Sequence, residues 1–366
     1  METYKLSDLC EILDSKRKPL SALQRAKKQG IYPYYGAQGI IDHLDDYLLD
    51  GEYLLVAEDG ANLETRNQPI ANIAKGKIWV NNHAHVLGSN GKCPLNLLGF
   101  ILNNMNISPY VTGCAQPKLN QENLRNIEIE LPSHIDSIAS ILSSLDRKIE
   151  LNNKINADLE EMAQAIFKNW FVDFEPFKDG KFVDSELGMI PEGWKVGTLG
   201  ELCNFKRGKN LLTKNAIDEG VPVVAGGLEP SCYHNIANTG APVITVSGSG
   251  ANAGFMRMYH VSVWASDCSF IDISCKNFYF VYCFLKVNSK LLKHAQTGAV
   301  QPHVKPSDIH DFELVIPDKE SIYDFQDKVK PFFDKIAVIQ KENSRLSLLR
   351  DTLLPRLMSG ELEVPE

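Results

Sequence analysis

The chain contains an internal duplication, and this feature constrains its fold more than any other. Leu-Ser-Asp-Leu-Cys at positions 6–10 resembles Leu-Gly-Glu-Leu-Cys at positions 199–203. Further matched pairs follow in the same order: 31–36 with 221–226, Gly60 with Gly250, Trp79 with Trp264, 112–118 with 297–303, and 126–132 with 311–317. The sequence therefore predicts two copies of one unit.

Each copy is predicted to form a domain of mixed helices and strands, followed by a long helix. Short β-rich runs at 52–57 and 241–246 stop at glycine-containing turns. Many short runs of this kind, broken by Gly, Asn and Pro, favour a loop-rich α+β domain over a regular βαβ array. The Pro/Gly-punctuated, acidic stretch at 174–194 is typical of a linker into the second domain.

The helical pattern after Pro132 and Pro317 is the clearest local signal. Apolar residues recur at alternating three- and four-residue steps from Ile135, and the same steps recur 187 residues later from Ile322. Two helices of roughly 50–60 Å are expected to pack on each other, at ~1.5 Å rise per residue. Ordinary core helices of a bundle would show the same periodicity. However, the same apolar stripe, or seam, is repeated in both halves, and this favours two helices that pack on each other as a spacer. Pro331 either kinks the second helix or marks its start.

Asparagine occupies the same position of both seams, at Asn156 and Asn343. A polar side chain in an apolar seam lowers stability but fixes register, because its amide is satisfied only opposite a matching partner. We therefore expect these two residues to set the spacer register.

Composition leaves a nucleic-acid partner open without suggesting one. The 366 residues carry a net charge of −8, which by itself argues against nucleic acid. The acidity is concentrated at 131–192, with 6 basic and 12 acidic side chains, whereas 193–317 carries 11 basic and 9 acidic ones.

The eight cysteines form no C-x-x-C pair, which is typical of reduced residues in a protein core. With no apolar run of membrane length and no signal peptide, we expect a cytoplasmic protein.

At this point the residues resemble a known family, the specificity (S) subunits of type I restriction-modification systems, or Methylase-S family. The likeness spans nearly the whole chain and includes the twofold repeat and the Ile-x-Ile-x-Leu-Pro segment at 127–132. The most specific stretches are Ala-Ile-Phe-Lys-Asn-Trp-Phe-Val-Asp-Phe-Glu-Pro at 165–176, Gly-Met-Ile-Pro-Glu-Gly-Trp-Lys at 188–195, and Leu-Leu-Pro-Arg-Leu-Met-Ser-Gly at 353–360.

The resemblance implies two target recognition domains held apart by an antiparallel coiled-coil spacer. The expected boundaries are domain 1 at 1–132, the central spacer helix at 133–173, a linker at 174–192, domain 2 at 193–317, and the C-terminal spacer helix at 318–360. It implies a non-catalytic subunit that reads a bipartite, asymmetric double-stranded DNA target and docks two methyltransferase subunits, which restriction-translocase subunits then join. S-adenosylmethionine, ATP and Mg would belong to those partners, and this chain would bind no cofactor.

Paired basic segments are the first candidate DNA contacts. Lys16-Arg17-Lys18 and Lys206-Arg207-Gly-Lys209 follow the matched Leu-x-x-Leu-Cys segments, one in each copy. Arginine grips guanine O6/N7 bidentately, and lysine suits phosphate. A solvated surface loop is an equally good interpretation. Further candidate cations extend or accompany these patches: Arg25, Lys27, Lys28, Lys75, Lys77, Lys214 and Arg257.

The Thr-Gly-x-x-Gln segments supply the second group of candidates. Their glutamines suit adenine, although a structural turn joining domain to helix is slightly favoured. The candidate residues are Thr112, Gln116 and Lys118 in the first copy and Thr297, Gln301, His303 and Lys305 in the second.

Catalytic motifs are missing from the sequence. It contains no Asn- or Asp-Pro-Pro-aromatic tetrapeptide, no G-x-x-x-x-G-K-[ST], and no true G-x-G-x-x-G, since the third glycine of 248–254 comes one residue late. His83 and His85 would share one strand face, but no third ligand lies nearby, so no metal site is expected. A fused DNA-modifying enzyme, and a scaffold or silent specificity cassette that reads no DNA, remain the alternatives.

Overall fold

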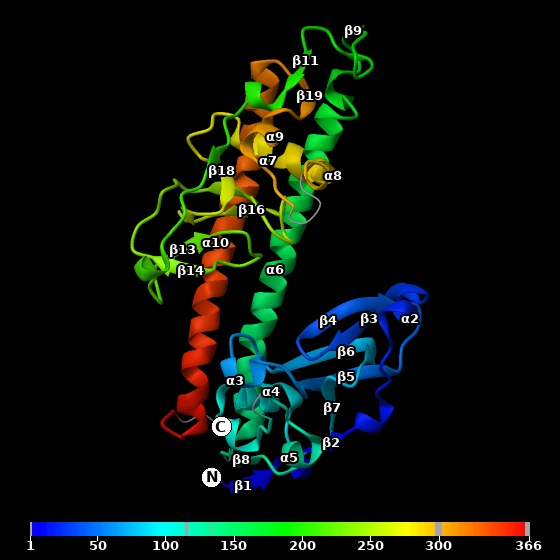
Figure 1. Cartoon of the computed structure of the whole chain (residues 1–366), viewed down its shortest axis with the longest axis vertical. Coiled ribbons are helices and arrows are strands. Elements are labelled where there is room, and N and C mark those ends of the chain that lie inside the picture. The colour runs from blue at the N-terminus through cyan, green and yellow to red at the C-terminus, as the bar shows by residue number, and fades with distance from the viewer. Residues whose placement is uncertain (1, 114–115, 133, 297–301, 363–366) are drawn as a thin grey trace. The chain divides into compact units, whose positions relative to one another are not determined.

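The protein is described by a computed structural model that covers residues 2–113, 116–132, 134–296 and 302–362. It divides into two compact units. Unit 1 combines Met1–Leu151 with Asn343–Glu366, and unit 2 is Asn152–Glu342. Two long helices, α6 (Ile135–Phe171) and α10 (Lys319–Met358), contribute to both units (Figure 1). No helix in the described part of the chain is both long and apolar enough to cross a membrane.

Unit 1 is built on a six-stranded sheet. Its strand order is β2 (Cys10–Ile12), β7 (Ala84–Ser89), β5 (Leu49–Ala57), β6 (Ala71–Val80), β3 (Gln29–Gly36) and β4 (Gly39–Leu44). All neighbours are antiparallel except β3 and β6. Along β5, Leu54 and Val56 join one buried cluster and Leu55 joins another, because successive side chains point to opposite faces of a strand. Both faces of this central strand are therefore covered.

Short helices and a second ladder complete unit 1. The ladder pairs β1 (Glu2–Lys5) with β8 (Glu128–Leu131). The remaining elements are α1 (Leu6–Leu9), η1 (Asp14–Lys16), α2 (Ala22–Ala26), α3 (Asn62–Thr65), α4 (Leu95–Asn104), η2 (Ser108–Tyr110) and α5 (Gln121–Arg125).

Unit 2 repeats this plan with shorter strands. One sheet has the order β12 (Lys206–Arg207), β18 (Cys268–Asp272), β15 (Val243–Ser247) and β16 (Met256–Tyr259), and another has β14 (Cys232–His234), β13 (Val221–Val224) and β17 (Trp264–Ala265). β11 (Lys195–Thr198) pairs with β19 (Glu313–Ile316), and β9 (Phe182–Val183) with β10 (Ile190–Pro191). The helices are η3 (Glu175–Phe177), η4 (Leu199–Glu201), η5 (Thr213–Asn215), α7 (Phe278–Val287), α8 (Ser289–His294) and α9 (Pro306–His310).

Equivalent hydrogen bonds confirm that the two units share one frame. The indole N–H of Trp79 donates to the Lys18 carbonyl at 2.7 Å, and that of Trp264 donates to the Lys209 carbonyl at the same distance. The Cys10 thiol donates to Leu6 and the Cys203 thiol to Leu199. The Gly60 N–H reaches the Pro117 carbonyl at 3.1 Å, as the Gly250 N–H reaches that of Pro302. The predicted repeat is therefore a repeat of structure.

One matched segment is displaced by a residue. Tyr34 pairs with Trp79 in the parallel ladder of unit 1, and Val223 pairs with Trp264 in that of unit 2. The structure thus aligns Pro33 with Pro222, whereas comparison of 31–36 with 221–226 aligned the glycines Gly36 and Gly226. Apolar strand residues carry little register information by type, so the partner strand decides the alignment.

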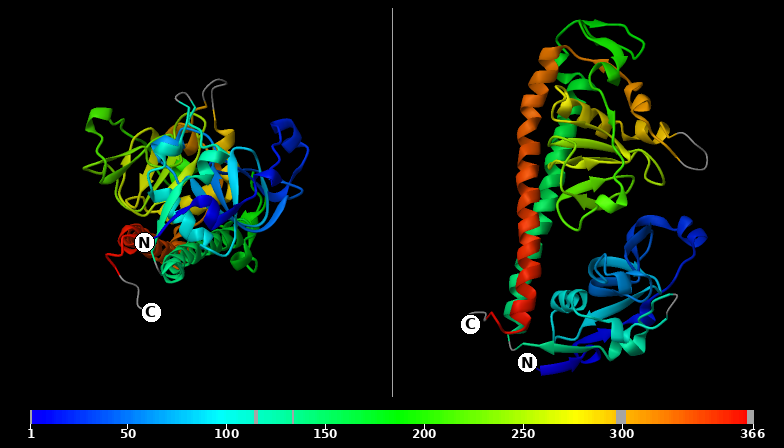
Figure 2. Two further views of the ribbon diagram at one scale, coloured as in Figure 1. Left: turned by 90° about the horizontal axis from the view of Figure 1, so that it is seen from below. Right: turned by 60° about the vertical axis from the view of Figure 1, so that its left-hand side comes forward.

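The two long helices are confirmed, and within each unit they run antiparallel. In unit 1, Asp146 of α6 pairs with Arg350 of α10 at 2.8 Å. In unit 2, the Asn152 amide donates to Glu342 at 2.9 Å, while both helices appear alongside each other in Figure 2. Because α10 begins at Lys319, Pro331 lies inside the helix and does not mark its start.

The polar seam positions differ from one another in their surroundings. Asn156 belongs to unit 2 and Asn343 to unit 1. The Asn156 side-chain oxygen is buried and has no hydrogen-bond partner within the described residues. Asn152, four residues before Asn156, donates its side-chain amide to Glu342 on the other helix. A register role for Asn156 and Asn343 stays a prediction.

The core of unit 2 is an aromatic cluster where α6, α7 and α10 meet. Phe325 is fully buried, and its ring centroid lies 5.2 Å from that of Phe171 and 5.6 Å from that of Phe167. Trp194 extends the cluster, since its ring packs 5.8 Å from Phe171 and 4.7 Å from Phe177. The linker stretch is therefore anchored to the helices by its aromatic residues.

Replacement of Phe325 should test this core. Phe325→Ala is expected to cost about 3–5 kcal/mol of unfolding free energy, because a buried ring leaves both lost contacts and a cavity. Tyr323→Ala, on the same helix but at a side chain that is 69% exposed, serves as the matched control. Urea unfolding followed by circular dichroism measures both; equal losses in the two variants would contradict the proposed role of the cluster.

Candidate nucleic-acid interface

Arg17, a candidate DNA contact in unit 1, is bound internally. Its guanidinium donates to Glu58 at 2.6 Å and to the Ala84 carbonyl at 3.0 Å, and it lies 3.3 Å from Asp14. Only 15% of the Arg17 side chain is exposed. An arginine with this many buried partners would have to break them before it could bind DNA, so the structure gives Arg17 a stabilising role.

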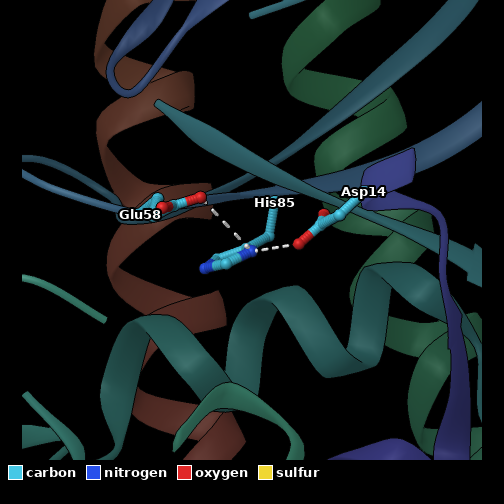
Figure 3. A group of neighbouring side chains, drawn as sticks. All are labelled: Asp14, Glu58 and His85. Atoms are coloured by element: carbon cyan, nitrogen blue, oxygen red, sulfur yellow. Dashed lines mark hydrogen bonds and ion pairs between the residues drawn. The ribbon is translucent and has the colours of Figure 1, made fainter. Parts of the chain in front are cut away.

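His85 lies at the centre of this buried network (Figure 3). Its Nδ1 is 2.6 Å from an Asp14 oxygen and its Nε2 is 2.7 Å from the Leu119 carbonyl. A carbonyl oxygen only accepts, so Nε2 donates to Leu119, while Nδ1 makes the contact with Asp14. Both ring nitrogens of His85 are therefore engaged within unit 1.

The carboxylates of the network are held in their charged forms. Burial raises the pKa of Asp14, but hydrogen bonds from His85 and the Val86 N–H, together with the charges of His85 and Arg17, outweigh burial and leave it below the usual value. Burial likewise raises the pKa of Glu58, and the hydrogen bond from Arg17 leads the effects that bring it below the usual value. Both groups favour folding when ionised.

The same three residues have the composition of a metal site. Ligand atoms of Asp14, Glu58 and His85 all lie within 4.8 Å of one another. However, both His85 nitrogens are already engaged, and Glu58 binds Arg17 and, at 3.2 Å, Lys118. These contacts fit an ion-pair network better than a cation site, because a metal would need lone pairs that the network already uses.

The two histidines of the sequence pattern have separate surroundings. His83 precedes β7, is half exposed, and pairs with Asp59 at 2.7 Å. His85 is fully buried and pairs with Asp14. They therefore share no common site.

The Thr-Gly-x-x-Gln turn of unit 1 is organised by its own backbone. Thr112 and Lys118 exchange backbone hydrogen bonds at 2.8 and 2.7 Å, and the Thr112 hydroxyl donates to the Lys118 carbonyl at 3.2 Å. Gln116 is exposed. The favoured interpretation of a structural turn thus accounts for Thr112, and Gln116 keeps its side chain in solvent. Thr297 and Gln301 lie outside the described residues.

Other cations of unit 1 lie around α2, β3 and β6. Arg25 pairs with Asp42 at 2.8 Å, Lys28 with Asp45 at 3.6 Å, and Lys75 with Glu52 at 3.2 Å. Lys77 lies 4.7 Å from the Tyr47 ring centroid and 5.8 Å from that of Tyr32, which is cation–π geometry. Lys16, Lys18 and Lys27 are exposed, with no ion pair among the described residues. These lysines and Lys77 are the cations of unit 1 best placed for phosphate.

The arginine candidates of unit 2 are more exposed than Arg17 and Arg25 of unit 1. Arg207 pairs with Asp267 and is 46% exposed. Arg257 pairs with Glu229 at 3.0 Å and lies over the Tyr259 ring. His303 bridges Ser249 through the backbone. The remaining candidates, Lys206, Lys209, Lys214 and Lys305, have exposed side chains.

Sequence reasoning missed the carboxylates that hold the arginines. Asp14 and Arg17 are three residues apart, so this partner had a local signal. Glu58 and Asp267 lie far from their arginines in sequence, and only the folded ladders bring them together. Trp79 and Trp264 are both buried, and each indole N–H donates to a backbone carbonyl.

Three of the buried cysteines have unreactive thiols. Burial raises the pKa of Cys10, Cys93 and Cys268 to about 12, so these groups stay neutral at physiological pH. None of the seven cysteines that the structure describes forms a disulfide.

Comparison with known proteins identifies the family of the chain. The sequence model of the type I restriction modification DNA specificity domain matches residues 1–161 and 191–347. The chain belongs to this family. Its two matched segments coincide with the two copies of the repeat, as the resemblance in the sequence implied.

Individual relatives in this specificity-domain family carry the same assignment. The chain is 33% identical over 280 residues to the type I restriction enzyme MjaIX specificity subunit of Methanocaldococcus jannaschii, covering 69% of this chain and 65% of that protein. It is 36% identical over 148 residues to a putative type I restriction enzyme specificity subunit, S.HindORF215P of Haemophilus influenzae, covering 40% and 37%. The aligned part thus spans less than two thirds of each relative.

A solved structure shows the same fold. The S subunit of a type I restriction-modification system from M. genitalium superposes with a TM-score of 0.54 at 18% identity, over 100% of this chain and 96% of that one. The predicted α+β class with two repeated domains and two long helices is confirmed by this likeness. The names of the relatives also agree with the prediction of a specificity subunit that is not itself the enzyme.

The buried network should make unit 1 sensitive to acid. Asp14→Asn is expected to cost about 3 kcal/mol of unfolding free energy, because it leaves the buried His85 without its charged partner. Because the folded pKa of Asp14 lies below its unfolded value of about 3.9, its contribution is present above that pH and lost as pH falls further. The variant should therefore lose less stability on acidification than the wild type.

Urea midpoints between about pH 6 and pH 3 measure this difference. Asp334→Asn, which removes an exposed carboxylate paired with Lys330, is the control and should leave the midpoint near that of the wild type. Parallel pH profiles of the wild type and Asp14→Asn would rule out the stabilising role assigned to the network.

Proposed function

We propose that the chain is the DNA-specificity subunit of a type I restriction-modification complex, and that its two units read the two halves of a split, asymmetric DNA site. The observation that supports the proposal is that the two units share one backbone arrangement but carry different side chains at equivalent positions. The Trp–Lys carbonyl bond, the Gly–Pro bond and the strand ladders recur in both. Reading heads of one fold can dock alike on DNA, while their exposed residues decide what each reads.

The exchanged residues lie at equivalent places of the sheets. In unit 1, His85 pairs with Val56 across the β7–β5 ladder, and in unit 2 Ser269 pairs with Val246 across the β18–β15 ladder. The bonds at Gly60 and Gly250 make Glu58 the counterpart of Gly248. A histidine and a glutamate of unit 1 thus correspond to a serine and a glycine of unit 2. Where such differences between the units reach the surface, the two units would read different half-sites, and the target would be asymmetric.

Lysines at the surface would supply affinity without sequence preference. Lys16, Lys18 and Lys27 in unit 1 and Lys209 and Lys214 in unit 2 have exposed side chains. Lysine contacts to phosphate release counterions, so DNA binding should weaken as salt increases.

The long helices are the proposed docking surface for two methyltransferase subunits. Leu151, Leu348 and Leu349 are exposed apolar side chains on the helices of unit 1, and Ile155, Met162 and Val338 are exposed on those of unit 2. Contiguous exposed apolar patches mark partner surfaces, and these side chains would contribute to such a patch on each unit. Their presence in both units favours one methyltransferase per repeat, with restriction-translocase subunits joining through that complex.

Cofactors belong to the partners in this proposal. S-adenosylmethionine would be bound by the methyltransferase subunits, and ATP and Mg by the translocase subunits. The residues described here supply recognition and docking. Methyl transfer by the purified chain alone would instead favour a fused DNA-modifying enzyme.

The first experiment is a methylome of a plain host that co-expresses this chain with the methyltransferase encoded beside it. Methylated adenines are expected at one split, asymmetric motif. Exchange of residues 193–317 for the corresponding domain of another family member should change one half of the motif and leave the other half intact.

A complex that co-purifies but modifies no DNA would contradict the reading function. That result would leave a scaffold or a silent specificity cassette as the better interpretation. A motif that changes in both halves after the exchange would contradict the assignment of one half-site to each unit.

A further inference from the structure

One surface of unit 2 has a charged pair where unit 1 has a closed network. Arg207 lies on the edge strand β12, and its guanidinium donates to Asp267 in the loop that precedes β18. The neighbouring Lys206 lines a separate hollow of about 480 Å³ with Asp272. The two adjacent cations of β12 therefore face different groups, as alternation along a strand requires.

Gly248 makes room for the Arg207 guanidinium. A Cβ added at this glycine would lie 3.0 Å from Arg207 Cζ and 3.1 Å from Nη2. The guanidinium thus packs directly against the Gly248 α-carbon, a position that any side chain at 248 would disturb. In unit 1 the counterpart of Gly248 is Glu58, which binds Arg17 instead.

Asp267 is held from two sides. The Ser249 hydroxyl donates to its second carboxylate oxygen, and the Gly248 N–H donates to its backbone carbonyl at 3.1 Å. Its side chain is 31% exposed and that of Arg207 is 46% exposed. In the network of unit 1, the side chains of Arg17 and Glu58 are only 15% and 13% exposed. The pair in unit 2 is therefore fixed in position and still open to solvent.

We propose that Arg207 and Asp267 together recognise one G·C base pair in the major groove of the half-site that unit 2 reads. Arginine donates two hydrogen bonds to guanine O6 and N7, and aspartate accepts one from cytosine N4. A fixed arginine beside a fixed carboxylate presents donors and an acceptor side by side, as the two bases of that pair require. A phosphate is a poorer partner, because Asp267 would repel it.

This inference rests on the proposed DNA-reading function and names the side chains that carry part of it. It also assigns different roles to the two basic segments that sequence comparison had placed together. Arg207 would specify sequence, whereas Arg17 stabilises unit 1.

The test uses the full chain in complex with its methyltransferase, and a pool of DNA duplexes of randomised sequence as the probe. Bound duplexes are sequenced, and the affinity for the selected motif is compared with that for single-base-pair variants. The wild type is expected to select a split motif with at least one G·C pair in the half that is lost on exchange of 193–317. Arg207→Ala should abolish the preference at one such position, a loss of roughly 10- to 100-fold in discrimination.

Arg207→Lys separates a base contact from a phosphate contact. A lysine keeps the charge but lacks the planar guanidinium fork, so the preference should weaken in this variant while the salt dependence of binding is kept. Asp267→Asn should weaken the preference at the same position, because it removes the carboxylate that fixes the arginine and accepts from cytosine. Lys195→Ala, which removes another exposed, ion-paired cation of unit 2, is the control and should leave the motif unchanged.

The outcomes distinguish this inference from the function on which it rests. A wild-type complex that selects no sequence would overturn both. A selected motif that survives intact in Arg207→Ala would overturn the G·C reading alone. Uniformly weaker binding to all duplexes, with a smaller dependence on salt and an unchanged motif, would show that Arg207 binds phosphate and would likewise overturn it.

Discussion

Each unit is closed by backbone pairing between its first strand and the strand that leads into its long helix, and the rest of the structure depends on this closure. β1 pairs with β8 in unit 1, and β11 pairs with β19 in unit 2, each through four residue pairs. The next bond also recurs, since the N–H of Leu6 reaches Ile127 and that of Leu199 reaches Phe312. Without this ladder the start of each domain would be free of its helix, and the helix could not hold a reading surface in a defined place.

This closure explains why the two units can differ so much at the surface. The frame is held by backbone hydrogen bonds, by tryptophan–carbonyl contacts and by buried apolar clusters, and none of these uses the exposed charged side chains. Under the proposed function, substitution at the loop ends would therefore change recognition with little cost to folding. In unit 1 the same loop ends contain the buried network around His85. These residues stabilise the fold and are less free to be substituted.

The sequence predicted the architecture well because its signals were periodic or duplicated. The seam from Ile135 and its copy from Ile322 specified both long helices, and burial of Ile138, Leu142, Phe325 and Val329 follows that seam. Phe167 and Phe333 were not on it, because the helices also pack against the domain of their own unit and therefore bury a second face. The one-residue displacement at β13 likewise depends on a partner strand that short apolar runs do not specify.

The candidate site was less predictable, for an electrostatic reason. Whether an arginine is available to DNA depends on the carboxylates around it, and those come from strands far away in sequence. Arg17 and Arg207 look alike in their basic segments, yet one meets Asp14 and Glu58 within the protein and the other meets Asp267 over a glycine. Desolvation distinguishes the two pairs. The buried pair gains strength from the low dielectric and would be costly to break, whereas the solvent-exposed pair keeps unused donors and acceptors open to a partner. Equivalent positions in a duplicated protein can therefore have different roles. For each arginine, the carboxylates on the neighbouring strands and loops decide whether it stabilises the fold or stays open to a partner.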